Sequence, residues 1–453
     1  MVYCESRAMP LAVRGSLWIF AVALAFAALG HRAAGASSPA MTETARDSTD
    51  ETVVVDFSVD LGPVTYRASG FLHGMAVTIP VQALVEPLKP KLFRGAEGRG
   101  RAFAIYQRAK GLGARFQLVV SDSYWDRKWP ETASNWKRWE ATVEDLVQGA
   151  KENGCTFEWD IWNEPEIDYF WEVDQARFFE TWRRTVLKIR ELDPGAVIVG
   201  PSLAKYDGKY LEDFLVYANT NHVLPDILCW HELDATDDGF RIIEADVADA
   251  RKLLAKHRIE IDRICINEII GPDLHTRPGA AVRSFAALER AGVDGACHAT
   301  WPDADGGYND ASLSGILTQR ERLPRSTWWA YKGYADVTGR LVSVQQSDSV
   351  DGIAGYDADA QEARMVLGRV AGDAPAGAVA LRLINLDDAP GIVLDAETHI
   401  TAQRIPMSGW ESLSSPVPLL DAEYEIRDGQ VALTLPEFGP DDAYLITVRA
   451  PGS

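Results

Sequence analysis

Two short carboxylate motifs stand far apart in this chain. They read Asp160-Ile161-Trp162-Asn163-Glu164-Pro165 and Ile264-Cys265-Ile266-Asn267-Glu268, and each ends an apolar, strand-like run on an Asn-Glu pair. Glycoside hydrolysis needs one carboxyl group to protonate the leaving oxygen and a second one to attack the anomeric carbon or to activate water. Two Glu on separate elements that face one cleft would suit this chemistry, whereas one motif alone would be weak evidence.

Other polar and aromatic residues also stand where apolar runs end. Arg94 ends an earlier run, Asp122 and Trp125 follow another, His231 lies at the end of a run between the two motifs, and Trp301 ends a run after them. Random surface loops would rarely collect such a set at matching positions. These positions indicate a single site built from the ends of several strands.

Strand periodicity gives a further expectation for the two Glu. Side chains alternate between the two faces of a strand, so Glu164 should share a face with Trp162, and Glu268 should share one with Ile266. We therefore expect both carboxyl groups to point into the same pocket.

The elements that must position these residues repeat as a strand followed by a helix. Between residues 67 and 336, short apolar runs alternate with amphipathic stretches of helical length. The predicted strands are Ala68–His73, Leu88–Arg94, Arg115–Ser121, Phe157–Glu164, Ala196–Pro201, Ile227–Glu232, Arg263–Glu268 and Gly295–Trp301, and the clearest helices are Asn135–Asn153, Gln175–Leu192, Asp238–His257 and Gly279–Gly292. This pattern predicts an α/β fold, a (β/α)8 TIM barrel, in which the C-terminal ends of the strands converge on one pocket.

The C-terminal part, residues 337–453, has a different pattern. Short alternating runs are separated by Asp, Gly and Pro turns, which predicts a β-sandwich domain after the barrel. Residues 52–66 include a strand-like run outside the barrel, and we expect it to join the β-sandwich because its backbone groups need a sheet edge to pair with.

The N-terminal segment, residues 1–36, resembles a secretory signal peptide. Arg7 and Arg14 precede an apolar run that is too short to span a bilayer, and Ala34-Gly35-Ala36 fits a cleavage site. Residues 37–51 read as a linker. We expect a secreted or periplasmic protein with no stable membrane association after cleavage; an uncleaved anchor is the alternative.

Composition and charge narrow the class of partner. The chain has 453 residues, a formal net charge of -21 and 14 Trp. This charge disfavours nucleic acid and anionic membrane surfaces. The charge also disfavours strongly anionic glycans as substrates, but only mildly. A local cation such as Arg94 or Lys205 could still bind one uronic acid carboxylate. We expect an oligosaccharide or polysaccharide as substrate, and the sequence leaves the oligomeric state open.

Cysteine usage does not indicate a disulfide scaffold or a metal site. Cys155, Cys229, Cys265 and Cys297 remain after signal removal, and we expect buried thiols, with a Cys265–Cys297 pair as the alternative. The sequence shows no C-x-x-C motif and no His-rich cluster. We expect neither a cofactor nor a metal.

At these motifs the chain resembles glycoside hydrolase clan A, and within it family 39, which includes β-xylosidases and α-L-iduronidases. The most specific element is Trp162-Asn163-Glu164-Pro165, which is similar to the strand-four motif of the clan. The resemblance implies that Glu164 is the acid/base and that Asn163 binds the 2-hydroxyl of the sugar. It also implies that Glu268 is the nucleophile.

The resemblance extends to residues that would support the two carboxylates. It implies that Arg94 keeps the nucleophile ionised, that Trp301 is an aromatic platform for the sugar, and that His231 lies near the nucleophile. Glu232 and Leu233 follow His231 where the family would have an aromatic residue, which bears on the choice of donor sugar.

Two further residues are candidates for substrate contact. His73, in Gly70-Phe71-Leu72-His73-Gly74, is a candidate ligand for the 3- or 4-hydroxyl, and a packed, hydrogen-bonded histidine is the alternative. Trp125 is expected either to wall a short pocket or to line an open groove.

Clan membership implies a retaining mechanism, with the two carboxyl groups about 5–5.5 Å apart and Glu268 forming a glycosyl-enzyme intermediate. We expect a retaining glycosidase acting on a xyloside-like or related plant or microbial glycan. The alternative from another class is a non-catalytic carbohydrate-binding protein on a hydrolase-like barrel.

Overall fold

The computed structural model describes residues 51–95, 99–124, 133–168, 170–171, 174–234, 240–303, 311–372, 375–389 and 397–451. The predicted signal peptide, residues 1–36, and nearly all of the predicted linker lie outside these residues, as does Trp125.

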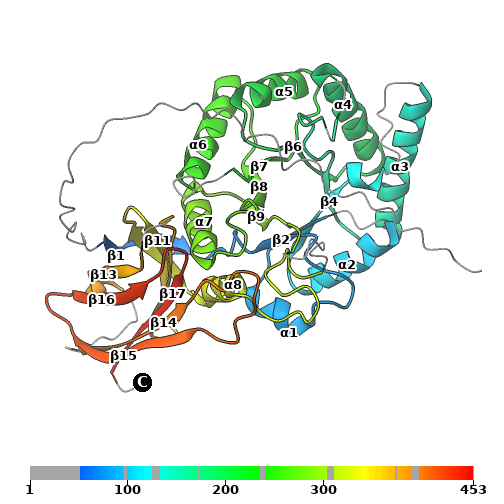
Figure 1. Ribbon diagram of the computed structural model, residues 1–453. Helices are drawn as coiled ribbons and strands as arrows, with labels where there is room; N and C mark the ends of the chain where they lie inside the picture. Colours follow the sequence, from blue (N-terminus) through cyan, green and yellow to red (C-terminus); the bar gives the residue numbers. More distant parts are fainter. Residues whose placement is uncertain are drawn as a thin grey trace, which may run out of the picture. The chain divides into compact units, whose positions relative to one another are not determined.

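Eight parallel strands close into a barrel (Figure 1). The barrel strands are β2 (Gly70–Leu72), β3 (Leu92–Gly95), β4 (Arg115–Val119), β5 (Glu158–Asp160), β6 (Val197–Leu203), β7 (Ile227–Glu232), β8 (Arg263–Ile269) and β9 (Gly295–His298). Each strand pairs with the next one along the chain, and Phe71 of β2 pairs with His298 of β9 to close the ring. The predicted eight-stranded parallel barrel is confirmed.

Helices follow the barrel strands and surround them (Figure 1). They are α1 (Gln82–Val85), α2 (Arg99–Gly111), α3 (Ala133–Glu152), α4 (Gln175–Leu192), α5 (Gly208–Thr220), α6 (Phe240–His257), α7 (Pro278–Ala291) and α8 (Ser326–Asp336), with the short 3-10 helices η1 (Glu86–Leu88) and η2 (Ser121–Ser123). The bounds of α3, α4, α6 and α7 agree with the predicted helices to within two residues.

Helix α4 shows why these segments become helices. Its N-cap, Asp174, accepts a hydrogen bond from the backbone N–H of Arg177 at 2.8 Å, which satisfies one of the free amide groups at the helix start. Phe178, Trp182 and Val186 recur every four residues and are buried, so they form one apolar stripe facing the barrel. Burying each such side chain contributes roughly 1.5–3 kcal/mol.

The remaining strands form one nine-stranded sheet. Its strands are β1 (Glu51–Pro63), β10 (Arg340–Gln345), β11 (Val350–Asp357), β12 (Glu362–Arg369), β13 (Gly377–Ile384), β14 (Glu397–Ile405), β15 (Val417–Glu425), β16 (Val431–Phe438) and β17 (Ala443–Arg449), and η3 (Leu386–Asp388) follows β13. The order across the sheet is β15-β14-β17-β12-β11-β10-β1-β13-β16. All pairs are antiparallel except β1 with β13.

This sheet differs from the predicted β-sandwich. Strand β1 hydrogen-bonds to β10 on one side and to β13 on the other, so it joins two groups of strands into one continuous sheet. The alternation along each strand predicts buried and exposed faces, but it does not specify which strands become neighbours. A largely antiparallel second sheet is therefore observed, and a sandwich of two sheets is not confirmed.

The second sheet packs against the barrel through α7 and α8, which lie beside it in Figure 1. Gly279 at the start of α7 lies so close to β12 that a Cβ atom there would be 2.0 Å from the carbonyl oxygen of Arg369. In β12, a Cβ atom on Gly368 would be 2.5 Å from the carbonyl oxygen of Gly279. Both glycines therefore allow a backbone-to-backbone contact between helix and strand.

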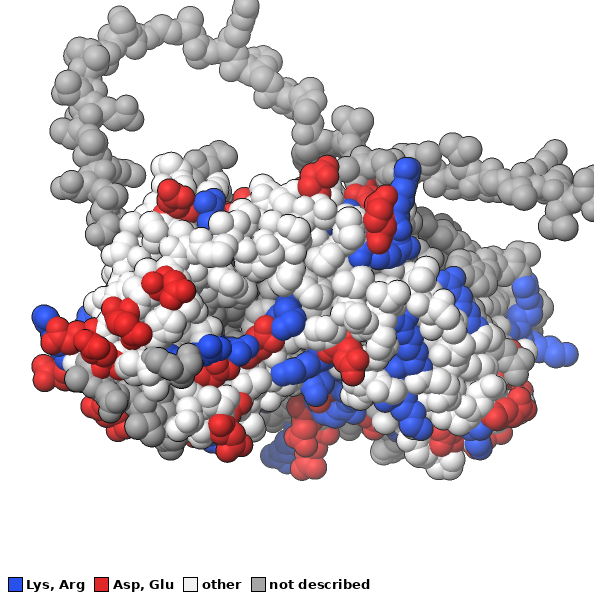
Figure 2. Space-filling view, turned by 90° about the horizontal axis from the view of Figure 1, so that it is seen from below, with Lys and Arg blue, Asp and Glu red and all other residues white. Residues whose placement is uncertain are grey.

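All four cysteines in the described part of the chain are free and buried, including Cys265 and Cys297 on neighbouring strands. Among the described residues, no helix has both the length and the apolar character required to cross a bilayer. Figure 2 shows one face of the molecule, on which acidic and basic side chains are interspersed.

Candidate functional site

Glu164 lies just beyond a barrel strand, in the loop that leads to α4. Strand β5 ends at Asp160, so the predicted strand is too long at its C-terminal end. Glu164 has a φ of 47°, a left-handed conformation that costs energy for a residue with a side chain and often occurs at functional sites. Its backbone N–H donates to the carbonyl of Ser202 at 2.9 Å. The loop geometry, and not strand alternation, therefore orients Glu164.

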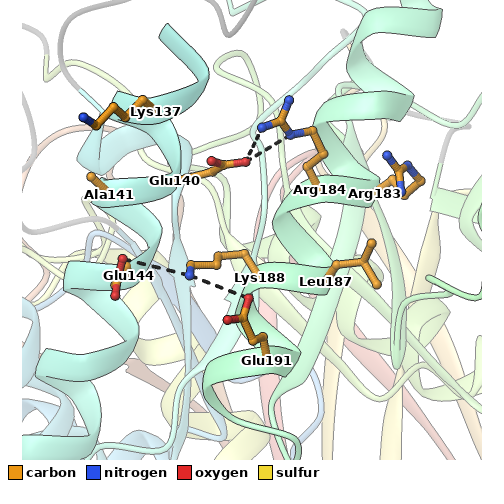
Figure 3. A pocket seen from close by; sticks show the side chains of 9 residues that line it. All are labelled: Lys137, Glu140, Ala141, Glu144, Arg183, Arg184, Leu187, Lys188 and Glu191. Carbon is orange, nitrogen blue, oxygen red and sulfur yellow. Dashed lines mark hydrogen bonds and ion pairs between the residues drawn. The ribbon is translucent and has the colours of Figure 1, made fainter. Parts of the chain in front are cut away.

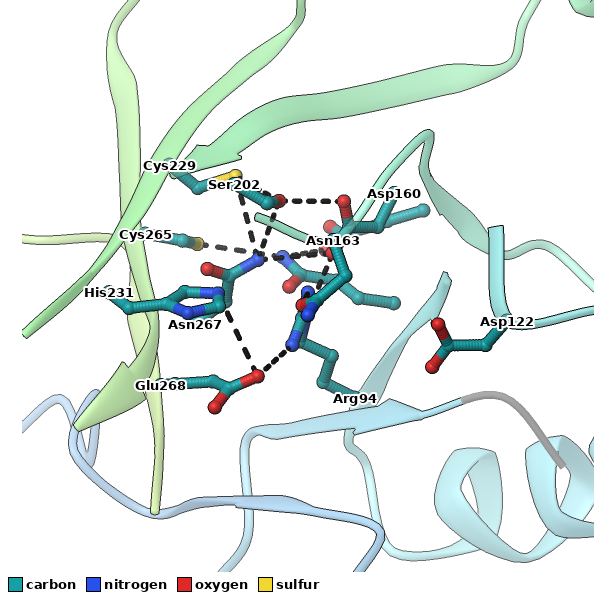
Figure 4. A network of polar contacts seen from close by, with 12 residues as sticks. Arg94, Asp122, Asp160, Asn163, Ser202, Cys229, His231, Cys265, Asn267 and Glu268 are labelled. Atoms are coloured by element: carbon teal, nitrogen blue, oxygen red, sulfur yellow. Dashed lines mark hydrogen bonds and ion pairs between the residues drawn. The ribbon is translucent and has the colours of Figure 1, made fainter. Parts of the chain in front are cut away.

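Glu268 lies within β8, next to an irregularity in the ladder. Trp230 of β7 pairs with Ile266, but the following residue, His231, pairs with Glu268, so Asn267 is the extra residue of a bulge. A bulge lets two consecutive side chains point to the same side. Asn267 and Glu268 both point into the polar network at the barrel mouth (Figure 4).

Arg94 connects the parts of this network (Figure 4). Its side chain is 1% exposed, and each guanidinium nitrogen has one partner. Nε donates to Asp160 Oδ2 at 2.7 Å, Nη1 to Glu268 Oε1 at 2.6 Å, and Nη2 to Asn163 Oδ1 at 2.8 Å. Burial alone would lower the pKa of Arg94, but the carboxylates of Asp160 and Glu268 raise it above its ordinary value. Arg94 is therefore a permanent cation beside Glu268.

Asp160 forms the floor of the site. It is fully buried and accepts hydrogen bonds from Arg94 Nε, from Ser202 Oγ at 2.6 Å and from Asn267 Nδ2 at 3.2 Å. A buried carboxylate is tolerated only when such partners compensate for its lost hydration. Asp160 therefore holds Arg94 in place from the side opposite to Glu268.

His231 lies between the two Glu. Its Nδ1 is 2.9 Å from Glu164 Oε1, and its Nε2 is 3.7 Å from Glu268 Oε1. The pKa of His231 is lowered to about 4, mainly by burial; Glu268 opposes this shift and Arg94 adds to it. The imidazole is consequently neutral at neutral pH, so the contact with Glu164 is a hydrogen bond and not an ion pair.

The two Glu are close together but differ in their surroundings. One carboxylate oxygen of Glu164 and one of Glu268 lie within 4.8 Å of each other. Burial raises the pKa of Glu164, and the charge of Arg94 opposes this only in part. Glu268 has the guanidinium in direct contact, whereas Glu164 has a neutral imidazole. The arrangement favours a protonated Glu164 beside an anionic Glu268.

Glu164, His231 and Glu268 are also spaced closely enough to hold a metal ion. However, Arg94 Nη1 already occupies Glu268 Oε1 at 2.6 Å. A second cation there would meet a buried guanidinium at short range, so the donor set is better suited to a pair of carboxyl groups than to a metal.

The other predicted site residues fall at the same end of the barrel. Asn163 is 8% exposed, and its Oδ1 accepts from Arg94, so its amide NH2 group takes no part in that contact. Trp301 lies in the loop after β9 and donates through Nε1 to the carbonyl of Ile270 at 2.9 Å. His73 follows β2 and lies against Gly95, where a Cβ atom would be 3.0 Å from its Nδ1.

Three buried residues of the network were not identified as site residues from the sequence: Asp160, Ser202 and Asn267. Ser202 has a φ of 58° and lies at a register shift between β6 and β7, so it resembles Asn267 in being turned inward by a bulge. Asp160 stands in the first motif, and the available signal was strand alternation, which places Asp160 on the same face as Trp162.

A surface groove of about 490 Å³ lies elsewhere, between α3 and α4 on the outside of the barrel (Figure 3). It is lined by Lys137, Glu140, Ala141, Glu144, Arg183, Arg184, Leu187, Lys188 and Glu191. Its charges are paired: Arg184 contacts Glu140, and Lys188 contacts Glu191 at 3.6 Å. None of these residues belongs to the network around Arg94.

Solved structures share this fold. N2152 from Neocallimastix frontalis is 26% identical, with a TM-score of 0.77 over 89% of this chain and 100% of that one. A family 39 β-xylosidase from Caulobacter crescentus is 16% identical, with a TM-score of 0.61, and the match covers 88% of this chain and 99% of that one. A family 51 α-L-arabinofuranosidase from Thermotoga petrophila is 11% identical, with a TM-score of 0.57, and the match covers 88% of this chain and 100% of that one. At the level of fold, these neighbours confirm the resemblance to clan A and family 39.

Curated relatives also match in sequence, and one of them has a known activity. A 3-O-β-L-arabinopyranosyl-α-L-arabinofuranosidase from Bifidobacterium pseudocatenulatum is 26% identical over 187 residues, which are 40% of this chain. The match spans only 18% of the length of that enzyme. No family model matches the chain.

Proposed function

We propose that this chain is a glycoside hydrolase that cleaves O-glycosidic bonds with retention of anomeric configuration. The observation that carries this proposal is the pair of Glu164 and Glu268, whose oxygens approach within 4.8 Å while their surroundings favour opposite protonation states. Retaining enzymes have their carboxyl groups about 5–5.5 Å apart, whereas inverting enzymes need about 6.5–9.5 Å to admit a water molecule. The short separation supports retention.

In the first step, the Glu268 carboxylate attacks the anomeric carbon. The bond from that carbon to the leaving oxygen breaks, and this oxygen takes the proton of Glu164. The product is an ester between the sugar and Glu268. Arg94 supports this role because its Nη1 pairs with Glu268 Oε1 and orients it, leaving the second oxygen for attack.

In the second step, Glu164 acts as the general base. It takes a proton from a water molecule, whose oxygen attacks the anomeric carbon as the bond to Glu268 breaks. Glu164 is thereby protonated again and Glu268 is again a carboxylate. Since His231 Nδ1 engages Oε1 of Glu164, the second oxygen of Glu164 can carry the transferred proton in both steps.

Two residues are proposed to bind the sugar in the donor position. Asn163 would donate its amide group to the 2-hydroxyl, because Arg94 fixes the opposite end of the amide. Trp301, fixed by its hydrogen bond to Ile270, would stack on the sugar ring.

The substrate is proposed to be a xyloside-like or related glycan. A family 39 β-xylosidase shares the fold, and the curated relative is an arabinofuranosidase. Pentosides are therefore the first compounds to assay: 4-nitrophenyl β-D-xylopyranoside and 4-nitrophenyl α-L-arabinofuranoside, followed by defined polysaccharides.

Azide rescue separates the roles of the two Glu. In Glu164→Ala, azide should restore turnover of the active aryl glycoside and yield a glycosyl azide of retained configuration, because the glycosyl ester still forms. In Glu268→Ala, azide should attack the anomeric carbon directly and yield the inverted azide. The same anomer from both variants would contradict the assignment.

The same assay tests a non-catalytic carbohydrate-binding protein. Such a protein would bind a polysaccharide on an affinity gel without releasing sugar from any compound, and Glu268→Ala would leave binding unchanged. Release that disappears in both Ala variants would exclude it.

We also propose that the protein is exported, on the basis of residues 1–36. Mass spectrometry of the mature N-terminus after expression in a secreting host tests this. A start near Ser37 supports cleavage, whereas a product that retains residues 1–36 contradicts it.

A further inference from the structure

The inference concerns Asp122, a carboxylate at the barrel mouth that the mechanism above does not use. It lies in η2, directly after β4, at the same barrel end as the two Glu. Figure 4 shows its carboxyl group pointing toward Arg94 and Asn163, without reaching either. Its one hydrogen bond within the described residues is a long one, 3.4 Å from Ser121 Oγ.

The surroundings of Asp122 are those of a ligand-binding group. The residue is half-buried, and burial raises its pKa, with His73 and Arg94 acting in the opposite direction. Asp160, by contrast, is a buried carboxylate with three strong donors. A carboxylate that gives up hydration without gaining internal donors is suited to donors from a ligand.

The charges around Asp122 limit the kind of sugar that can bind. A substrate carboxylate would need a cation, but all three nitrogens of Arg94 are engaged and its side chain is 1% exposed. His231 is neutral, since its pKa is about 4. Apart from His73, the described residues of the network thus combine several carboxyl groups with one buried arginine whose three nitrogens each have a partner.

We infer that Asp122 binds hydroxyl groups of the donor sugar and selects an uncharged sugar over a uronic acid. Two neighbouring hydroxyls can donate to the two oxygens of one carboxylate, whereas a uronic acid would place a second negative charge beside it. This inference rests on the proposed glycosidase function. Of the two cations considered from the sequence, Arg94 is buried and engaged at all three nitrogens, and Lys205 is exposed just beyond β6, outside the network of contacts around Arg94.

The test compares a matched set of substrates. 4-Nitrophenyl β-D-xyloside, β-D-glucoside and β-D-glucuronide share a ring and differ at one carbon, which carries hydrogen, a hydroxymethyl group or a carboxylate. The wild type should cleave the glucuronide at least about 100-fold less efficiently than the glucoside, by kcat/KM, because unpaired buried charge is rejected strongly. Comparable values for these two compounds would overturn the inference.

Variants of Asp122 then test whether this residue causes the preference for an uncharged sugar over a uronic acid. Asp122→Ala should lower kcat/KM for the neutral substrate about 10- to 100-fold, as expected for a charge-assisted hydrogen bond. Asp122→Asn keeps the shape and removes the charge, so it should raise the efficiency on the glucuronide relative to the glucoside. Asp262→Asn, an exposed carboxylate before β8 at the opposite end of the barrel, is the matched control and should match the wild type.

Deoxy substrates separate binding from a structural effect. With a substrate that lacks one of the contacted hydroxyls, the 3-deoxy or the 4-deoxy xyloside, Asp122→Ala should lower kcat/KM by a smaller factor than it does with the parent xyloside. An equal loss on parent and deoxy substrates, or an Asp122→Ala variant within twofold of the wild type on all compounds, would overturn the inference. A wild type that cleaves none of them, and neither the arabinofuranoside nor the polysaccharides named above, would instead overturn the proposed function on which the inference rests.

Discussion

Glu164 and Glu268 are the same residue type in one pocket, and what separates their chemistry is the neighbour of each. Arg94 contacts Glu268 at 2.6 Å, whereas the neutral His231 contacts Glu164 at 2.9 Å. A fixed cation stabilises the carboxylate, and apolar burial stabilises the protonated acid. The proposed division of roles thus rests on two side chains outside the pair, Arg94 and His231.

This difference predicts a particular pH dependence. The reaction needs protonated Glu164, and its pKa is raised by burial. Because the folded pKa is above the ordinary value, the acid form persists to higher pH, and activity is lost as pH rises through the folded pKa. The basic limb of the kcat/KM profile should therefore lie above the ordinary range of a glutamic acid.

The assignment of that limb is checked in Glu164→Ala. With an activated leaving group such as 2,4-dinitrophenol, which needs no protonation, the variant should keep its glycosylation step and lose the basic limb. A basic limb that stays in place in this variant would belong to another group and would contradict the assignment.

At the residue scale, the sequence located the two Glu of the candidate site better than the network beneath them. The two Asn-Glu pairs were recognisable as motifs, so Asn163, Glu164 and Glu268 were identified directly. Ser202 and Asn267 were not: Ser202 lies beyond the end of the predicted strand Ala196–Pro201, and strict alternation assigns Asn267 to the face opposite to Glu268. The register shifts that turn them inward come from pairing between strands, and single-strand periodicity contains no information about pairing.

At the scale of elements, the barrel depends on close contacts that only glycine permits. The N-terminal end of α7 packs on β12 through Gly279 and Gly368, and α7 follows the strand that carries Glu268. Gly279→Ala should lower the free energy of unfolding by about 1–3 kcal/mol, because a Cβ atom 2.0 Å from the carbonyl oxygen of Arg369 forces the backbones apart.

Urea unfolding measures this effect, with Gly111→Ala as the matched control. Gly111 lies in α2 with nothing within 4 Å of an added Cβ atom, so its replacement should leave stability unchanged or raise it slightly. Equal stability of the Gly279→Ala and Gly111→Ala variants would argue against the close contact.

The helices could be predicted from the sequence because each has its own apolar stripe and end signals, as α4 does. The second sheet could be predicted only as a set of strands. Its order depends on β1, which inserts between β10 and β13 from the far end of the chain, and no local pattern specifies such a partner.

At the scale of the whole molecule, residues 48–453 form one compact unit in which the first described strand completes the last sheet. Heat should therefore unfold the barrel and the second sheet together. Val53→Ala, at a fully buried site in β1, should lower the stability of the whole unit by about 2 kcal/mol.

Differential scanning calorimetry tests this expectation. Val53→Ala should show a single transition at lower temperature, while Val59→Ala, which changes a 42% exposed residue of the same strand, should resemble the wild type. A separate low-temperature transition in Val53→Ala, with a second transition at the wild-type position, would mean that the sheet unfolds on its own.

The central claim, that Glu268 forms a covalent bond to the sugar while Glu164 serves as acid and base, is tested most directly by trapping. The protein is incubated with the 2-deoxy-2-fluoro glycosyl fluoride of its preferred sugar and digested, and the peptides are identified by mass spectrometry. We predict stoichiometric labelling of the peptide that contains Glu268, with loss of activity. Labelling of Glu164, or continued turnover to a product of inverted configuration without any label, would contradict the account.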